Sequence, residues 1–324
     1  MALTLAQAAL LSNDVLQAGV IEKFVKDDPV LERLPFITIV GNSLVYNIEL
    51  TEATAEWHEV NGTWVESTPT FEHGDATLKI LGGDADLDNF LKATRSDIND
   101  LKAEMIAAKI KAVKKAFMTA FYYGYSGVDT NAFSGLHYLI SSSTYNTQAM
   151  GSSTSAAEPL SMNKLEATVD MIKGFTPDIM MMSKQMRRNI NTYLRGAGGI
   201  TYEDFANKRV QTIYGIPVGV SDYISDAENC NEAYGSYYGH DHDEGITWTA
   251  ASETGEQATT IFVLTFDPKG CCGVQNGDMT TVPLGDLETK DASRYRIKWY
   301  VSLMLQNILS CAKITGIENA TAVA

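Results

Sequence analysis

The sequence predicts an α+β fold, and three observations carry this prediction. Hydrophobic residues make up 45% and charged residues 20% of the 324 residues, which is ordinary for a globular protein and excludes a disordered chain. Segments rich in β-branched and aromatic residues, beginning with 36–50, predict strands. The stretch 94–123 has apolar residues at spacings of three and four, which predicts a long helix. Helix and strand patterns then alternate from about 160 to 285.

Residues 1–35 predict an N-terminal arm. Leu11 and Val15 belong to a short apolar stripe, and Pro29 and Pro35 interrupt the chain after it. A segment this short cannot fold alone, so we expect it to lie on another surface. It has no basic residue before Lys23 and no long apolar run, unlike a secretory signal, so we expect a cytoplasmic protein without a membrane partner.

Residues 36–84 predict a long acidic β-hairpin and its base. Between residues 47 and 78 the chain carries seven carboxylates and no lysine or arginine. The dipeptide Asn61-Gly62 is typical of a hairpin turn because both residues tolerate positive φ. Trp57 and Trp64 flank this turn. The hairpin could fold back on its own domain, but exposed tryptophans favour one that reaches a neighbouring subunit.

Residues 94–123 predict the spine of the molecule. Thr94, Ser96 or Asp97 can cap the helix, and Gly124 can end it. At ~1.5 Å per residue it forms a rod of roughly 40 Å, which suits a structural support better than a compact enzyme core. Its polar faces carry lysines that favour the C-terminal half, as the helix dipole prefers: Lys102, Lys109, Lys111, Lys114 and Lys115.

A Gly/Ser-rich passage up to residue 160 separates this helix from a second unit. Ser161 and Ser183 are expected to cap two helices on either side of a short buried strand, 178–183. Long strands in 294–317 are expected to return to the sheet begun by 36–50, which makes the first domain discontinuous.

The sequence gives little evidence of a catalytic site. The sequence contains no P-loop, no dinucleotide fingerprint following a strand, no G-x-S-x-G and no H-E-x-x-H. His240, His242 and Asp243 could hold a divalent ion, but a solvated Gly/Tyr-rich loop is the stronger interpretation. Cys271 and Cys272 are interpreted as packing residues, and we expect all four cysteines to be free. We therefore expect no enzyme, no catalytic residue, no cofactor and no metal.

Charge limits the possible partners. Twenty-five basic against 40 acidic residues give a formal net charge of −15, which argues against a protein that grips nucleic acid. Arg187, Arg188 and Arg195 could touch phosphate, although a solvated helix face or a subunit contact is favoured.

The order of these parts resembles the major capsid proteins of tailed bacteriophages, whose fold is shared by encapsulins. The resemblance covers nearly the whole chain. None of the sequence segments that carry the resemblance is a chemical motif, but the order and spacing of these segments along the chain make the match specific. The carriers are FYYGYSG and AFSGLHYLI after the long helix, PDIMMMSKQMRRNINTYL, IYGIPVGVSDYI, FDPKGCCGVQNGDMTTVPL and RYRIKWYVSLMLQNILSCAKITGI.

The resemblance implies a phage major capsid fold (Hong Kong 97-type) and a division into domains. Residues 1–35 would be the N-terminal arm and 36–84 the extended loop with its base. Residues 85–160 with 289–324 would form the peripheral domain around the spine helix, and 161–288 the axial domain. Some family members cross-link through a lysine on the extended loop, and this loop has none.

The implied function is to assemble as hexamers and pentamers into an icosahedral shell around double-stranded DNA. The implied location is the virion, after assembly in the host cytoplasm. Scaffold, portal and decoration proteins would be further partners, and the packaged DNA would make weak, non-specific contact. An encapsulin-like shell around cargo is the alternative, and a metal-dependent hydrolase using His240, His242 and nearby carboxylates is a more distant one.

The hairpin and the spine helix supply the expected contacts between subunits. The hairpin carboxylates have no lysine or arginine among them, so they need an external positive surface. We expect the basic face of a neighbour's spine helix to provide it, with Arg294 or Arg296 as the alternative. The expected contact residues are Glu56, Trp57, Glu59 and Trp64 on the hairpin and Lys109, Lys111, Lys114 and Lys115 on the helix.

Overall fold

The structure is a computed structural model. It describes residues 29–323 except 52, 91–100, 128, 142–145, 151–156, 198, 200, 206–207, 227, 230–238, 242–244 and 248–256. Most of residues 1–35, the expected helix caps Thr94, Ser96 and Asp97, and Cys230 therefore lie outside the described residues. No helix within the described ranges is long and apolar enough to cross a membrane.

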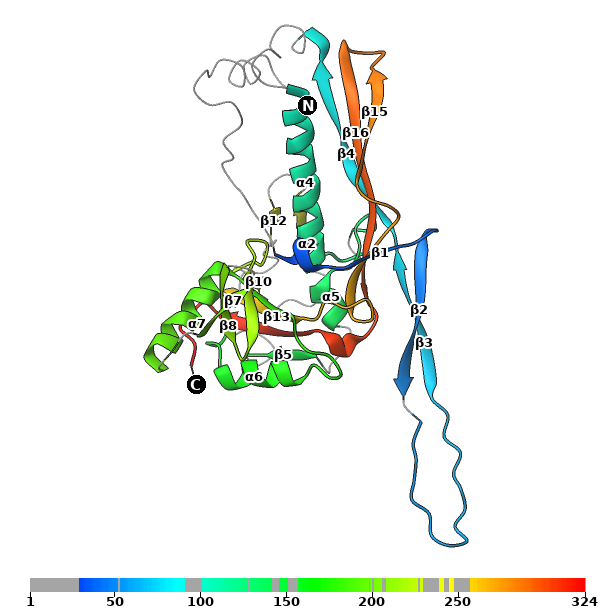
Figure 1. The fold of residues 1–324 in the computed structure, drawn as a ribbon, viewed down its shortest axis with the longest axis vertical. Helices are drawn as coiled ribbons and strands as arrows, with labels where there is room; N and C mark the ends of the chain where they lie inside the picture. Colours follow the sequence, from blue (N-terminus) through cyan, green and yellow to red (C-terminus); the bar gives the residue numbers. More distant parts are fainter. Residues whose placement is uncertain are drawn as a thin grey trace.

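An elongated five-stranded sheet forms one half of the molecule (Figure 1). Its central strand is β16 (Ala292–Leu305), which pairs with β4 (Lys79–Asp88) along one edge. Along its other edge β16 pairs with β15 (Thr280–Asp286) and β14 (Cys271–Gln275). The short strand β1 (Phe36–Thr38) runs parallel to β14. Because β16 has 14 residues, this sheet is long and narrow.

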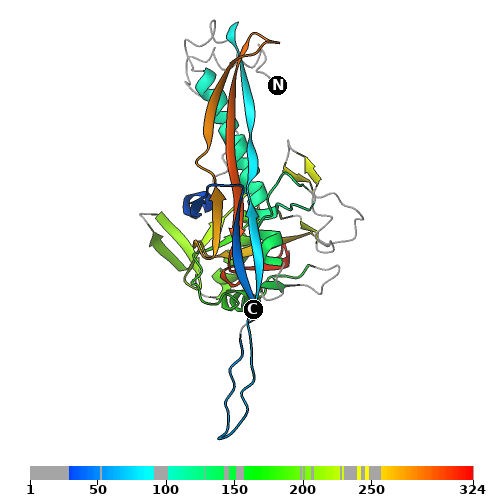
Figure 2. The ribbon, with the colours of Figure 1, turned by 90° about the vertical axis from the view of Figure 1, so that its right-hand side faces the viewer.

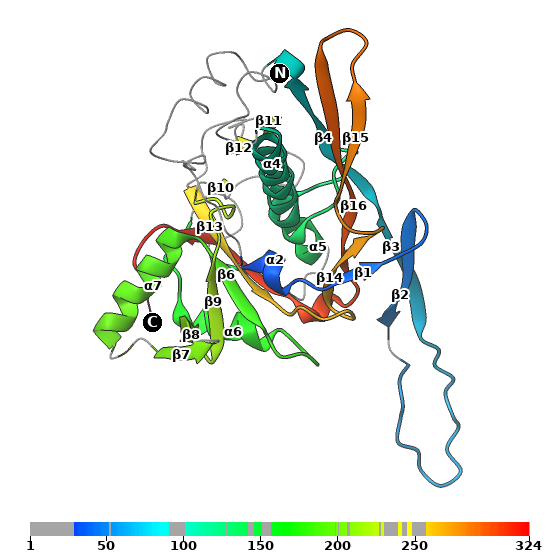
Figure 3. The same cartoon turned by 45° about the horizontal axis from the view of Figure 1, so that its top comes forward.

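Helix α4 (Leu101–Tyr123) lies along this sheet (Figures 1 and 3). Val113, Phe117 and Phe121 recur every four residues and are buried. The ring of Phe117 lies 4.9 Å from that of Trp299 in β16. The helix ends before Gly124, where a β-carbon would lie 2.2 Å from the carbonyl oxygen of Phe133, so only glycine permits this close turn. The chain then enters α5 (Leu136–Ser141).

An eight-stranded sheet forms the core of the other half. One face packs against α4 and α5, and the other against α6 (Met162–Asp170) and α7 (Lys184–Ala197). The strand order is β5 (Thr147–Ala149), β17 (Ala312–Glu318), β13 (Gln257–Leu264), β6 (Ile179–Met182), β9 (Ile216–Val220), β8 (Lys208–Ile213) and β7 (Thr201–Phe205), with β10 (Glu228–Asn229) paired to β13.

The two central strands of this sheet are apolar on both faces. In β13, Ile261 and Val263 join one core while Phe262 and Leu264 join the other. All four residues of β6 are buried, as expected for the segment 178–183. A strand covered on both faces reads as a continuous apolar run, which is why its sequence was distinctive.

The strand pairing differs from the expected division at two points. Strands β14 and β15, expected in the axial unit, pair with β16 in the elongated sheet. Strand β17, expected beside β16, lies in the eight-stranded sheet, because the 3₁₀ turn Ile308–Ser310 carries the chain from one sheet to the other. The domain boundaries themselves remain a prediction.

The helix caps were predicted with mixed success. The Met186 N–H donates to Ser183 Oγ at 3.1 Å, so the cap of α7 is confirmed. Ser161 occupies the N-cap position of α6, but its side chain makes no capping hydrogen bond. Its backbone instead forms a β-bridge with Val323, which fixes the start of α6 without the hydroxyl.

The first described residues are anchored on the body of the molecule. Helix α2 (Val30–Arg33) is a single turn, and Val30 and Leu34 are buried in the core beside α4. Four further strands complete the described elements: β2 (Ser43–Thr51) with β3 (Thr70–Thr77), and the pair β11 (Gly239–Asp241) and β12 (Gly245–Thr247).

Candidate intersubunit surfaces

Residues 43–77, which we call the hairpin, project from the body of the molecule. Strands β2 and β3 pair antiparallel from Ser43 opposite Thr77 to Thr51 opposite Thr70. Beyond them the tip loop, residues 53–69, continues without regular structure (Figure 1). Figure 2 shows the hairpin continuing the long axis of the elongated sheet. The tip loop therefore lies away from both sheets of its own chain.

The tip loop presents large apolar side chains to solvent. Trp57 is 103% exposed and Trp64 79% exposed, and Val60 and Val65 are exposed beside them. Asn61 adopts a φ of 70° and the Gly62 N–H donates to the Glu59 carbonyl at 2.9 Å, so a turn is present at the predicted place. It closes an irregular loop, however, because the paired strands that were predicted to flank it end at Thr51 and Thr70. Clusters of exposed apolar residues of this kind mark interaction sites on soluble proteins.

The hairpin is strongly acidic. Its described carboxylates belong to Glu49, Glu56, Glu59, Glu66, Glu72 and Asp75, and the hairpin carries no lysine or arginine. Its two histidines are His58, whose ring lies 4.2 Å from that of Trp64, and His73, which hydrogen-bonds Asn47 Oδ1 at 2.7 Å. A cationic surface on another chain would match this charge.

The lysines of α4 do not share one environment. Lys109 lies against β4 of its own chain, so close that a β-carbon at Gly83 would be 2.5 Å from Lys109 Cε. Lys102 lies over the ring of Tyr295, with Nζ 4.7 Å from its centre. The side chains of Lys111, Lys114 and Lys115 are exposed. Of the four lysines expected to contact a neighbour, Lys109 thus has its surroundings within the same subunit.

Arg294 and Arg296, the alternative partners expected for the hairpin, each form an ion pair inside the chain. Arg294 donates Nε and Nη2 to the two carboxylate oxygens of Asp86 at 2.6 and 2.8 Å. Arg296 binds Asp84 in the same forked manner at 2.7 and 2.8 Å. The register of β4 and β16 places each pair directly opposite. Sequence reasoning missed these carboxylates, although D-A-D and R-Y-R share the two-residue spacing of one strand face.

The structure only partly covers the metal candidates. His240 lies in β11 opposite Ile246, whereas His242 and Asp243 lie outside the described residues. Within the ranges that the structure describes, no group of three or more His, Cys, Asp or Glu residues could hold a metal ion. The metal hypothesis therefore stays a prediction from sequence.

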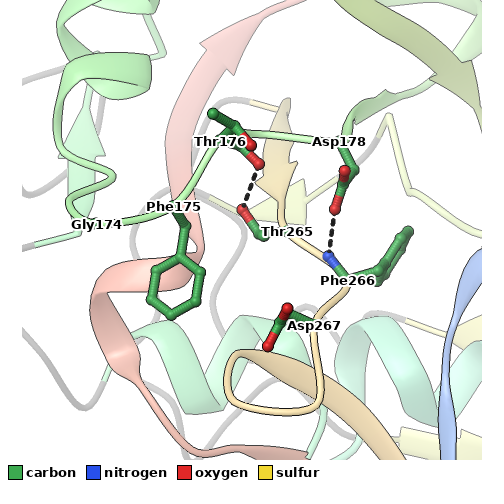
Figure 4. A pocket seen from close by; sticks show the side chains of 7 residues that line it. All are labelled: Gly174, Phe175, Thr176, Asp178, Thr265, Phe266 and Asp267. Atoms are coloured by element: carbon green, nitrogen blue, oxygen red, sulfur yellow. Dashed lines mark hydrogen bonds between the residues drawn. The ribbon is translucent and has the colours of Figure 1, made fainter.

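A hollow of about 470 Å³ lies between the turns that follow α6 and β13 (Figure 4). Its two carboxylates hold these turns in place. Asp178 Oδ2 accepts the Phe266 N–H and Asp267 Oδ1 accepts the Lys269 N–H, both at 2.8 Å. Both carboxylates therefore have a structural role, because each accepts a hydrogen bond from a backbone N–H. The lining residues are Gly174, Phe175, Thr176, Asp178, Thr265, Phe266 and Asp267.

Titratable side chains are also buried at the joint between the two halves. Glu228 accepts hydrogen bonds from the Tyr123 and Thr260 hydroxyls. Lys313 Nζ donates to the His137 carbonyl oxygen at 2.7 Å, and His137 Nε2 lies 3.9 Å from Glu228 Oε2. None of these five residues lines the hollow between the two turns. The cluster therefore joins α4 and α5 to strands β10, β13 and β17.

Comparison with known proteins places the chain in a family. A sequence model of the phage capsid family matches residues 8–264. The chain belongs to the phage capsid family. It is a capsid protein, and its family and fold are those of structural proteins. A search of curated protein sequences finds no match to this capsid protein.

Solved structures share the fold of this capsid protein at low sequence identity. An encapsulin, from the holo-SrpI encapsulin complex of Synechococcus elongatus PCC 7942, matches with a TM-score of 0.70 and 11% identity, over 100% of this chain and 99% of its own. Mycobacterium phage Bobi matches with a TM-score of 0.60 and 13% identity, over 97% and 98%. The capsid of Myoviridae Phage XM1 matches with a TM-score of 0.60 and 10% identity, over 94% and 97%.

Proposed function

We propose that this capsid protein tiles an icosahedral shell as hexamers and pentamers, and that the shell encloses double-stranded viral DNA. The hairpin is the single observation that carries this proposal. Its tip loop exposes Trp57 and Trp64 far from the body of its own chain. Burial of such side chains stabilises a complex by about 1.5–3 kcal/mol each when a partner covers them. A subunit with this shape is therefore completed by its neighbours.

The partner we propose for the hairpin is the α4 face of an adjacent subunit. Lys111, Lys114 and Lys115 are exposed there, and the hairpin tip offers Glu56 and Glu59. Arg294 and Arg296 are already paired with Asp84 and Asp86. Single exposed ion pairs contribute only ~0.2–1 kcal/mol, so charge would set the register and rate of assembly while the tryptophans hold the shell together.

An encapsulin-like shell around protein cargo is the second candidate, since an encapsulin shares the fold over the whole chain. The contents of the shell distinguish the two. We place the viral shell in the virion after assembly in the host cytoplasm, with scaffold, portal and decoration proteins as further partners and weak, non-specific contact with the DNA. We assign it no catalysis and no cofactor.

The test is the assembly state of the purified full chain, observed by negative-stain electron microscopy with and without a scaffold protein. We expect closed particles, which hold nuclease-protected DNA when isolated from infected cells. A variant in which residues 52–69 are replaced by a two-residue Asn-Gly turn, directly between the paired Thr51 and Thr70, should stay folded and form no particles. A wild-type chain that remains a monomer under all conditions would refute the proposal, and particles filled only with protein would favour the encapsulin alternative.

A further inference from the structure

Helix α7 presents a continuous basic face to solvent. Lys184, Arg187, Arg188, Asn191 and Arg195 fall at helical spacings on one side and line a hollow of about 350 Å³. The opposite side carries Met186 and Ile190, which are buried in the core. The helix contains no acidic residue. In a chain with a formal net charge of −15, such a face stands out.

Few of the cationic side chains on this face form ion pairs within the chain. Lys184 Nζ lies 2.7 Å from Asp222 Oδ2, and Asn191 accepts a hydrogen bond from Gln211. Among the residues that the structure describes, no carboxylate forms an ion pair with Arg187, Arg188 or Arg195, which are all exposed. These arginines are therefore available to a partner.

Helix α6 offers an acidic face with the same spacing. Asn163, Glu166, Ala167 and Asp170 follow one another at the i, i+3, i+4 and i+7 positions, and all four are exposed. The basic residue of this helix, Lys164, points elsewhere and donates to the Met150 carbonyl oxygen at 2.9 Å.

The two faces belong to two helices that pack on the same side of one sheet, and the Tyr214 hydroxyl between β8 and β9 donates to the Met162 carbonyl oxygen of α6 at 3.3 Å. Helix α6 packs on β17 and β5, whereas α7 is bound through Asn191 to β8 and through Lys184 to the segment after β9. Figures 1 and 3 show α6 and α7 at different margins of this half of the molecule. Two different surfaces of one chain that complement each other give head-to-tail contacts, which close into a ring when the rotation between copies allows it.

We propose that the basic face of α7 docks on the acidic face of α6 in a second copy of this chain, and that repetition of this contact closes the ring of subunits in each hexamer or pentamer. The inference rests on the proposed function and names the residues of one of its contacts. A second copy is favoured over DNA because α6 exposes the carboxylates of Glu166 and Asp170, whose charge is opposite to that of the α7 arginines, and because the net negative charge of every copy repels phosphate.

Charge reversal with rescue tests this contact. Arg187→Glu with Arg188→Glu should lower the rate of ring and shell formation about tenfold at low salt, and less at high salt. Glu166→Arg with Asp170→Arg should cause a similar loss. Combining all four changes in one chain makes every contact complementary again, in rings of five or six, and should recover at least a third of the wild-type rate. Circular dichroism checks that each variant is folded, and Arg187→Gln with Arg188→Gln should give an intermediate rate.

The control variant is Lys269→Glu with Lys290→Glu, which makes the same change in net charge at exposed sites on other turns and should assemble at the wild-type rate. If wild type assembles and the α7 variant assembles equally fast, the α7–α6 contact is refuted while the proposed function stands. If the α7 variant assembles normally but retains less nucleic acid, the arginines bind phosphate and the proposal is wrong. If Glu56→Lys with Glu59→Lys on the hairpin rescues the α7 variant instead, the partner is the hairpin. A wild-type chain that forms no particles would overturn the proposed function and this inference together.

Discussion

Glu228 and Lys313 are ionisable groups buried at the joint between the two halves, and their surroundings shift their pKa values. Burial raises the pKa of Glu228 to about 7 despite its hydrogen bonds from Thr260 and Tyr123. Burial also lowers the pKa of Lys313 to about 7. The pKa of His137 is lowered well below its usual value, first by burial and then by Lys313. Each shift has the sign expected when the charged form loses its solvation.

The first prediction is that Glu228→Gln changes the pH dependence of subunit stability. Between pH 4.5 and about 7 the folded state holds the Glu228 proton and the unfolded state does not, so this group's stabilisation is full below 4.5 and is lost as pH rises through 7. The loss is on the order of 3 kcal/mol across this window. The variant should lack this decline in unfolding midpoint.

His137 has the opposite effect, because its lowered pKa means that a fall in pH destabilises the folded state. His137 is present in wild type and in Glu228→Gln, so it affects the unfolding midpoints of both. Glu288→Gln, at an exposed turn, is the matched control and should follow wild type. Parallel midpoint curves for wild type and Glu228→Gln between pH 4.5 and 7 would show that Glu228 is not held protonated.

At the scale of single elements, the paired charges of β4 and β16 fix the register of two strands that are more than 200 residues apart in sequence. The hydrogen bonds from Arg296 and Arg294 hold the pKa values of Asp84 and Asp86 below the ordinary value of 3.8. The stabilisation from these pairs is therefore present above pH 3.8 and is lost as pH falls through the lowered values.

The second prediction follows from this register. Arg296→Asp places like charges directly opposite each other and should speed amide hydrogen exchange in β4 and β16. Asp84→Arg combined with Arg296→Asp should restore most of the protection, while Arg296→Gln alone should give an intermediate effect. If the double variant exchanges as fast as Arg296→Asp, the pair does not set the register.

The third prediction concerns the hairpin and α4 as charged elements. Glu56→Lys with Glu59→Lys should slow or misdirect assembly, most strongly at low salt where charge is least screened. Lys114→Glu with Lys115→Glu in the partner subunit should partly restore the rate, measured by light scattering. A reversed hairpin that assembles at the normal rate at every salt concentration would remove the electrostatic part of the proposed contact.

What the sequence could predict at this scale depends on how local the cause is. The cap of α7 and the buried strand β6 depend on residues within one turn or one strand, and both were predicted. The placement of β17 could not be, because its apolar pattern suits either sheet and its partner β13 lies about 50 residues away. The Arg294–Asp86 pair was missed for the same reason, since the sequence alone does not reveal which strands pair.

At the scale of the whole molecule, the hairpin separates the stability of the subunit from that of the shell. The fourth prediction is that Trp57→Ala with Trp64→Ala leaves the unfolding midpoint of the free subunit unchanged, because both side chains are already exposed to water there. The finished shell should melt several degrees lower, since truncation of buried interface tryptophans costs about 2 kcal/mol or more each. Scanning calorimetry of subunits and particles separates the two effects.

Phe117→Ala in α4 is the matched contrast. Its ring is fully buried in the subunit core, so the variant should destabilise the free subunit by about 3–5 kcal/mol. A shell of the tryptophan double variant with unchanged thermal stability would contradict the idea that a neighbour covers the tip loop.

Because the tip loop reaches a neighbour, a defect in it weakens the adjacent subunit's contact and leaves the fold of its own chain intact. A subunit with a damaged tip folds normally and is as stable in isolation as the wild type, so it is incorporated into the growing particle. The weakness then appears in the adjacent copy that receives the tip. In a cell that makes both forms, the intact copies cannot protect themselves, and a minority of damaged chains spoils many particles. Variants of Trp57 or Trp64 should therefore behave as dominant traits, whereas core variants such as Phe117→Ala should behave as recessive ones.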